Sequence, residues 1–188
     1  MKTLVLFGSA REKGHTRAML DLFLDTLGGE YEIIDAYRLE EEISPCKDCR
    51  FCWYENSCSI KDGMIDVYKK IEESDNIVLA SPIYFHSISG KLKIIIDRLQ
   101  PYWASRLRND SIKNFRKTGS ILMVGGSAPF ENQFLGGELV LKNSLKYMSI
   151  NFTGEVTFSN SDRDCLETRP DVAQKIIDLA NKVKALNK

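Results

Sequence analysis

An uninterrupted apolar run near the start of the chain, followed by a polar loop and an amphipathic helix, most constrains the fold. Residues 4–7 are Leu, Val, Leu and Phe, a pattern typical of a strand buried on both faces. The loop of residues 8–16 carries two glycines, hydroxyl groups and basic side chains, and residues 17–27 have apolar side chains at helical spacing. In open α/β folds, such a loop binds an anion through backbone N–H groups and the helix dipole. The stretch therefore predicts a buried strand and a bound phosphate group.

The spacing within this loop excludes two common classes of phosphate binder. Five residues separate its two glycines, and His15 follows the second glycine where a nucleoside triphosphatase loop needs lysine. No G-x-G-x-x-G run is present, so a dinucleotide fingerprint does not fit either. A single terminal phosphate, such as that of flavin mononucleotide (FMN), fits a loop that offers Ser9, Arg11 and Thr16. The alternative is a polar turn that caps the helix and binds nothing.

Composition limits the class of protein. A chain of 188 residues that is 43% apolar can bury one substantial core, and we expect a single domain over residues 1–188. Basic and acidic residues balance at 26 each, so nothing in the overall charge points to nucleic acid or to a membrane surface. No leader segment or membrane-spanning run is recognisable, which predicts a soluble, cytoplasmic protein whose five cysteines are reduced thiols or metal ligands.

Four later apolar stretches predict further strands, at residues 31–35, 76–81, 118–124 and 151–158. Segments with helical spacing alternate with the five predicted strands, at residues 17–27, 63–74, 90–99, 137–148 and 170–186. Pro101 should interrupt or kink the third of these helices, and residues 102–115 have no clear assignment. The alternation predicts an α/β protein with a three-layer, flavodoxin-like fold and a five-stranded parallel sheet of order 2-1-3-4-5. The loops after strands one, three and four would then meet at one edge of the sheet.

The loop after the third strand carries a family resemblance. Residues 81–98 resemble the S-P-x-Y…S-x-S-G-x-L-K-x-x-x-D-R signature of flavodoxin-fold NAD(P)H-dependent FMN reductases. Residues 8–16 resemble the G-S-x-R-x-x-G-x-T phosphate loop of the same family. Both matches lie where the strand order requires them, and the fold-level similarity spans nearly the whole chain. A phosphorylated signalling receiver shares this fold, but Ser81-Pro82 stands where its aspartate would be.

The resemblance implies a set of flavin-binding residues. The phosphate would be bound by Ser9, Arg11, His15 and Thr16. The isoalloxazine ring would lie against Pro82, Ile83, Tyr84 and Phe85, with Gly125, Gly126 and Ser127 on the other side. His86 lies in the same loop and is a further candidate for contact with the flavin, the alternative being an ordinary surface histidine. His15 departs from the family, in which many members have asparagine. No catalytic side chain is required because the flavin carries the chemistry; the alternative for the aromatic residues is ordinary packing at a strand end.

A long connection at about residues 36–62 contains a cluster of cysteines. Its spacing is C-x2-C-x2-C-x5-C, formed by Cys46, Cys49, Cys52 and Cys58. The motif resembles that of the iron-sulfur flavoproteins, a branch of the same family in which these cysteines hold a [4Fe-4S] cluster. A structural zinc site and a metal-free loop are the alternatives. Cys165 is most simply a free thiol.

The leading functional prediction is an FMN-dependent oxidoreductase. It would take electrons from NAD(P)H or a reduced protein and pass them through the flavin to a flavin, quinone-like or other small acceptor. The alternative is an iron-sulfur flavoprotein that carries electrons between ferredoxin-like partners and FMN, and a flavin-free scaffold is a third possibility. The resemblance also implies a homodimer or homotetramer, and the balanced charge leads us to expect no nucleic-acid or membrane partner.

Overall fold

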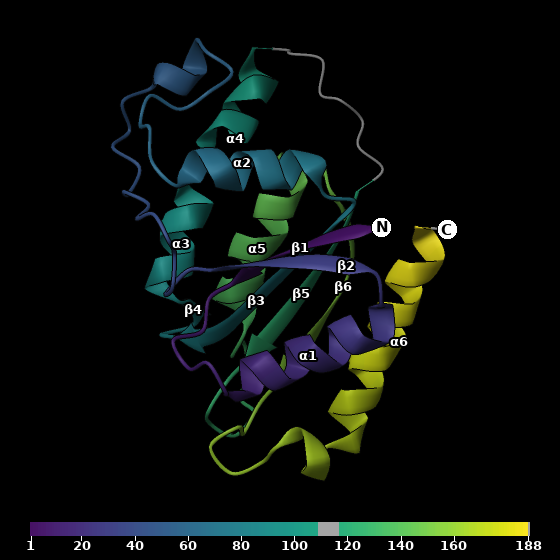
Figure 1. Cartoon of the computed structure of the whole chain (residues 1–188). Helices are drawn as coiled ribbons and strands as arrows, with labels where there is room; N and C mark the ends of the chain where they lie inside the picture. Colours follow the sequence, from purple (N-terminus) through teal and green to yellow (C-terminus); the bar gives the residue numbers. More distant parts are fainter. Residues whose placement is uncertain (109–116, 188) are drawn as a thin grey trace.

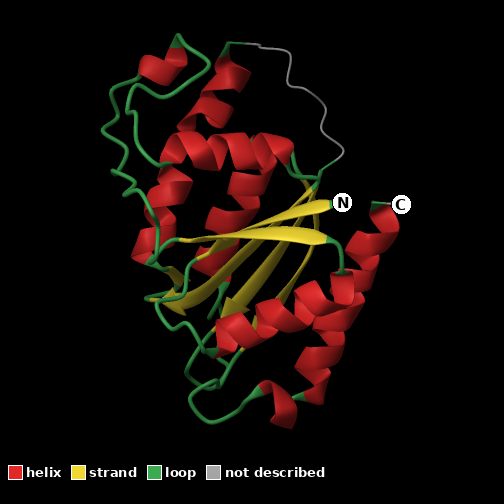
Figure 2. Cartoon of the chain, viewed as in Figure 1, coloured by secondary structure: helices red, strands yellow, loops and turns green. Residues whose placement is uncertain are grey.

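A computed structural model describes residues 1–108 and 117–187, which form a twisted sheet between two layers of helices (Figures 1 and 2). The strands are β1 (Lys2–Phe7), β2 (Glu30–Asp35), β3 (Asn76–Tyr84), β4 (Ser87–Ile88), β5 (Thr118–Val124) and β6 (Asn151–Phe158). The α-helices are α1 (His15–Leu27), α2 (Met64–Glu73), α3 (Gly90–Asp97), α4 (Gln100–Leu107), α5 (Leu135–Tyr147) and α6 (Pro170–Leu186). Two short 3-10 helices are η1 (Phe51–Trp53) and η2 (Leu166–Thr168).

The described residues form a six-stranded sheet of order β2-β1-β3-β5-β6, with β4 paired to β3 outside this path. The predicted five-stranded sheet of order 2-1-3-4-5 was therefore incomplete. The pairs along the main path are parallel, whereas β4 is antiparallel to β3. The extra strand is only two residues long, and β3 continues past the predicted end at residue 81. A strand this short has no recognisable periodicity, so the sequence assigned it to a loop.

Successive residues of the central strands pack against opposite helical layers, because side chains alternate across a strand. On one face, Val5 and Phe7 join the core built on α1 and α6. On the other face, Leu4 and Leu6 join the core built on α2, α3 and α5. Figure 1 shows these two layers on either side of the sheet. The continuous apolar strands thus follow from burial on both faces.

The helix predicted over residues 90–99 ends earlier than expected. It breaks at Arg98 and Leu99, and Pro101 lies in the first turn of the next helix, α4, rather than interrupting one. Proline is well tolerated there because its missing N–H has no partner within a helix. Residues 102–107 belong to α4, and residues 109–115 of the unassigned stretch lie outside the described part.

The cysteine-containing connection between β2 and α2 has little regular structure. Its only described helical turn is η1, and this turn packs against α4 at the periphery of the fold (Figure 1). The described helices include none that is both long and apolar enough to cross a membrane.

Candidate functional site

The loop after β1 presents an open helix N-terminus. The Gly8 N–H donates to the Ala80 carbonyl at 2.8 Å and joins the start of the loop to β3. Arg11 donates its backbone N–H to the Ser9 hydroxyl at 3.2 Å, which folds the loop back on itself. Helix α1 then begins without a side-chain cap, and Thr16 lies buried in its first turn. Uncapped N–H groups, two hydroxyls and the exposed Arg11 side chain form a donor set suited to a phosphate.

The same loop also contacts residues at the ends of the two outer strands, β2 and β6. Arg38, just beyond β2, pairs with Asp35 at 2.8 Å and donates to the Ala10 carbonyl at 2.9 Å. The half-buried His15 ring meets the Phe158 ring edge-on, with 5.6 Å between the centroids. Sequence reasoning missed Arg38, because a single arginine after a predicted strand carries no motif. The loop conformation is therefore held by its neighbours as well as by its own residues.

The second loop is a tight hairpin between β3 and β4. Tyr84 pairs with Ser87, and the two residues between them, Phe85 and His86, have φ values of 48° and 61°. Both residues adopt the left-handed conformation of a type I′ turn, a position that normally selects glycine or asparagine. The Phe85 side chain is 104% exposed. A bulky aromatic residue held in this conformation on the surface is a typical feature of a functional site.

A pocket of about 380 Å³ lies between this hairpin and the loop after β5. Its lining residues are Ile83, Tyr84, Phe85, His86, Gly125, Gly126, Ser127, Phe130 and Gln133. The structure therefore brings together seven residues that the sequence proposed for the flavin ring. Pro82 and the phosphate-loop residues Ser9, Arg11, His15 and Thr16 lie at the same edge of the sheet but do not line this pocket.

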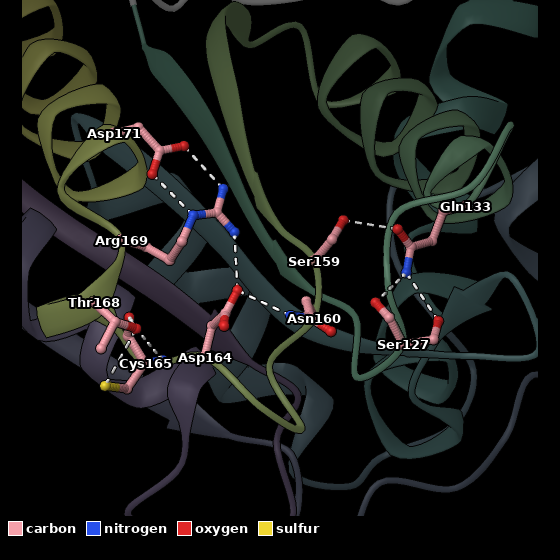
Figure 3. Close-up of polar contacts among 9 residues, drawn as sticks. All are labelled: Ser127, Gln133, Ser159, Asn160, Asp164, Cys165, Thr168, Arg169 and Asp171. Atoms are coloured by element: carbon pink, nitrogen blue, oxygen red, sulfur yellow. Dashed lines mark hydrogen bonds and ion pairs between the residues drawn. The ribbon is translucent and has the colours of Figure 1, made fainter.

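Side-chain hydrogen bonds hold the loop after β5 in place (Figure 3). The buried Gln133 amide donates to the Ser127 carbonyl at 3.3 Å and to the Ser127 hydroxyl at 3.2 Å. Its carbonyl oxygen accepts the Ser159 hydroxyl at 2.7 Å, and the Asn160 N–H donates to the Ser127 carbonyl at 2.7 Å. The loop after β6 thus supports the wall of the pocket. Sequence reasoning missed Gln133 and Ser159 because they belong to no motif.

This network continues outward to the start of α6 (Figure 3). The Asn160 side chain donates to the Asp164 carboxylate at 3.0 Å, and Arg169 lies 3.5 Å from the same carboxylate. Arg169 also pairs with Asp171 at 2.8 Å, and this contact lowers the pKa of Asp171 to about 2. The loop after β6 is therefore anchored at both of its ends.

The four clustered cysteines line a second, smaller pocket. Trp53 and Arg98 are among the other residues that line this pocket. All four cysteines are free thiols. A hydrogen bond with the Ser59 hydroxyl, 3.1 Å from its sulfur, lowers the pKa of Cys49, whereas burial raises the pKa of Cys52. Within residues 1–108 and 117–187, three or more His, Cys, Asp or Glu side chains do not come together as ligands for a single metal ion.

A buried ion pair lies beneath this pocket. The Arg98 guanidinium meets the Asp62 carboxylate through two contacts, of 2.8 Å and 3.1 Å. Burial opposes ionisation of Asp62, but hydrogen bonds from Arg98 and from the Ser44 and Met64 backbone outweigh it and keep its pKa below the usual range. Arg98 is the last residue of the family signature at residues 81–98, but sequence reasoning assigned no role to it.

Aromatic and backbone contacts hold the outer side of the cysteine segment against α4. The Trp53 and Trp103 rings lie 5.9 Å apart, and Arg108 donates to the Cys52 carbonyl and to the Asn56 side chain. Together with the buried ion pair, these contacts fix a segment that lacks regular structure. The segment is a thiol-rich site with a cation beneath it, and this donor chemistry fits an iron–sulfur group.

Comparison with known proteins identifies the family. The model of the family described as NADPH-dependent FMN reductase matches residues 1–162. An iron-sulfur flavoprotein of Methanocaldococcus jannaschii is 34% identical over 131 residues, which are 68% of this chain and 63% of the relative. An iron-sulfur flavoprotein of Archaeoglobus fulgidus is 33% identical over 54% of this chain and 47% of its own length. The chain thus spans between about half and two thirds of these two relatives.

Two further comparisons cover most of the chain. An iron-sulfur flavoprotein of Methanosarcina thermophila is 27% identical over 191 residues, or 95% of each chain. The solved structure of an NAD(P)H:quinone oxidoreductase from Methanothermobacter marburgensis superposes with a TM-score of 0.76 over 98% of this chain and 96% of that chain, at 16% identity. The structural likeness confirms the flavodoxin-like fold. The family match covers well over half of the residues, and the chain belongs to the NADPH-dependent FMN reductase family.

Proposed function

We propose that the protein is an FMN-dependent oxidoreductase that passes electrons from NAD(P)H through bound flavin to a small acceptor. The observation that carries this proposal is the meeting of three strand-end loops at one edge of the sheet. One loop offers an uncapped helix N-terminus, and the other two form a pocket with exposed aromatic residues. An elongated ligand with a phosphate at one end and a flat ring at the other matches this arrangement.

In this proposal, each group of residues has its own task. The phosphate is bound by Ser9, Arg11, His15 and Thr16. The ring is bound by Pro82, Ile83, Tyr84, Phe85 and His86 on one side and by Gly125, Gly126 and Ser127 on the other. FMN supplies hydride and electron transfer when bound, so the protein contributes binding, orientation and exclusion of water rather than an acid or base.

A comparison of FMN with riboflavin tests the phosphate site directly, because riboflavin lacks the phosphate. We expect Arg11→Ala to raise the dissociation constant of FMN on the order of 10- to 100-fold, as is typical for loss of a charge-assisted hydrogen bond. Riboflavin binding should not change. Arg17→Ala is the matched control, because Arg17 pairs with Asp21 on α1 at 2.7 Å. Equal weakening of both ligands would remove Arg11 from the phosphate site, and absence of FMN binding by the wild type would overturn the proposal.

The cysteine pocket favours a second candidate, an iron-sulfur flavoprotein that carries electrons between a ferredoxin-like partner and FMN. Its support is the four thiols that line one pocket, together with relatives that bear that name. In this reading, Cys46, Cys49, Cys52 and Cys58 bind a [4Fe-4S] cluster. Protein purified without oxygen should then show a broad brown absorption that disappears in Cys49→Ser. Steady oxidation of NADPH by the purified protein with an added acceptor favours the enzyme over the carrier.

The assembly and the location stay predictions, the first from the family resemblance and the second from the sequence itself. We propose a homodimer or homotetramer in the cytoplasm. Light scattering of the FMN-loaded protein measures the assembly, and a monomeric mass would contradict it.

A further inference from the structure

Arg98 is the largest fully buried side chain of the described part, with only 1% of it exposed. It follows the last turn of α3 and reaches the cysteine segment from below. Its Nη1 donates to the Ser44 carbonyl at 2.7 Å, and its Nη2 lies 3.4 Å from the Ile60 carbonyl. These two carbonyls stand two residues before the first clustered cysteine and two residues after the last. One guanidinium therefore joins the two ends of the segment.

Four of the five N–H groups of this guanidinium have partners, and the fifth does not. Each terminal nitrogen donates to one backbone carbonyl and to one oxygen of Asp62. Among the described residues, Arg98 Nε is one of three buried side-chain nitrogen or oxygen atoms without a hydrogen-bond partner. A buried donor left unpaired destabilises a fold, because it has lost its hydrogen bond to water without gaining another. Because the other four N–H groups of Arg98 all have acceptors, we expect its Nε–H to have an acceptor too.

The surroundings of Arg98 indicate what that partner is. Arg98 lines the pocket that also contains the sulfur-bearing side chains of Cys46, Cys49, Cys52 and Cys58. Thiolate and inorganic sulfide are hydrogen-bond acceptors, and a thiolate-ligated iron–sulfur cluster carries negative charge that a buried cation offsets. Hydrogen bonds to cluster sulfurs are one of the main determinants of reduction potential.

We infer that Arg98 is a positioning residue that clamps both ends of the cysteine segment and keeps its Nε–H for a sulfur atom of a bound iron–sulfur cluster. The second half of this inference rests on the proposed cluster, whereas the clamp does not. The role is distinct from cysteine ligation, because Arg98 acts through the backbone of Ser44 and Ile60 and through one hydrogen bond.

The clamp is tested without metal, by amide hydrogen exchange over residues 44–62 in the FMN-loaded protein. Arg98→Lys keeps the charge but removes the planar fork, so exchange in this segment should accelerate about tenfold or more. Arg106→Lys is the matched control, because Arg106 Nε is likewise buried and unpartnered but its contacts are with Lys146 and Ser149 on the α5 side. Equal exchange in the wild type and Arg98→Lys overturns the clamp.

The donor role is tested after anaerobic reconstitution with iron and sulfide. Arg98→Lys should lower the midpoint potential of the cluster by about 59 mV, which is a tenfold change in the one-electron equilibrium constant. Arg106→Lys should leave the potential unchanged. In the wild type, the Arg98 Nε–H resonance should shift on reconstitution while that of Arg106 does not, which gives a result even if Arg98→Lys fails to fold.

The outcomes separate the two proposals. A reconstituted wild type whose Arg98 resonance does not move, or a variant with an unchanged potential, overturns the donor role and leaves the cluster standing. A wild type that takes up no iron overturns both the cluster and the donor role, and the exchange experiment still decides the clamp.

Discussion

Two pockets of the molecule are built in different ways: the flavin-side pocket, lined by residues 83–86 and 125–127, and the cysteine pocket, lined by the four clustered cysteines. The first lies where parallel strands end, and its walls are loops whose ends are fixed by the sheet. The second lies in a connection whose only described regular turn is η1, held from below by Arg98 and from the side by α4. A backbone framework distributes its support over many hydrogen bonds, whereas the cysteine segment depends on a few side chains. Single substitutions should therefore affect the second region more strongly.

Helix α3 joins the two regions. Its N-terminus is capped by Ser89, which also donates its backbone N–H to the Ser81 hydroxyl within β3, and its C-terminus leads into Arg98. Eight residues at about 1.5 Å each separate these ends by about 12 Å. The two pockets thus lie at opposite ends of one short helix.

The largest effect is expected at the base of the cysteine segment. Asp62→Asn leaves the Arg98 charge buried without its partner, and loss of one member of a buried pair destabilises by about 3–5 kcal/mol. Urea unfolding at neutral pH measures this loss. Asp66→Asn is the control, because Asp66 pairs with Lys70 on the exposed side of α2 and should contribute less than about 1 kcal/mol. Similar losses in both variants would show that the buried pair at the base of the cysteine segment contributes no more than an exposed ion pair.

The same pair predicts a pH dependence. The folded-state pKa of Asp62 is lowered, so its stabilising contribution is present above the unfolded pKa of about 4 and is lost as the pH falls through the folded value. The difference in unfolding free energy between the wild type and Asp62→Asn should therefore shrink in acid. A difference that stays constant from neutral pH to about pH 2 would contradict this assignment.

Sequence reasoning predicted those features that repeat along the chain. The apolar strands and the helical spacing gave the layers, because each strand buries both faces and each helix buries one. They could not give β4, whose two residues form a strand only because the turn at Phe85 and His86 brings them back onto β3. The break between α3 and α4 was likewise displaced from Pro101 to Arg98.

The candidate site was predictable only where its residues belong to motifs. The motifs in two loops predicted residues that the structure brings together in one pocket. Gln133 and Ser159, which support that pocket, belong to no sequence motif and were not predicted. Their roles arise from contacts between the loops after β5 and β6, which are distant in sequence. Arg98 is similar, since its partners Ser44 and Asp62 are identified only once the connection is folded.

An intermediate effect, on FMN binding, is expected when the hydrogen bonds that support the flavin-side pocket are removed. Gln133→Leu keeps the bulk of the side chain but leaves the Ser127 and Ser159 groups without this partner. Loss of about 1.4 kcal/mol would raise the FMN dissociation constant about tenfold, measurable by calorimetric titration. Asn143→Ala removes an exposed hydrogen bond to Leu139 on α5 and should leave the constant unchanged. An unchanged constant in Gln133→Leu would show that the pocket wall holds without this network.

The smallest effect concerns backbone strain at the hairpin tip. Phe85 has a φ of 48° and a fully exposed side chain, so Phe85→Gly removes an unfavourable conformation while losing almost no packing. We expect the free energy of unfolding to rise by about 0.5–1 kcal/mol. Ser149→Gly, at a φ of 59° in the turn before β6, relieves the same conformation but loses a 3.4 Å hydrogen bond from Arg106, so it should be stabilised less. Only Phe85→Gly should weaken FMN binding, by a few fold, because only Phe85 lines the pocket. If both variants bind FMN as tightly as the wild type, the Phe85 side chain does not contribute to FMN binding.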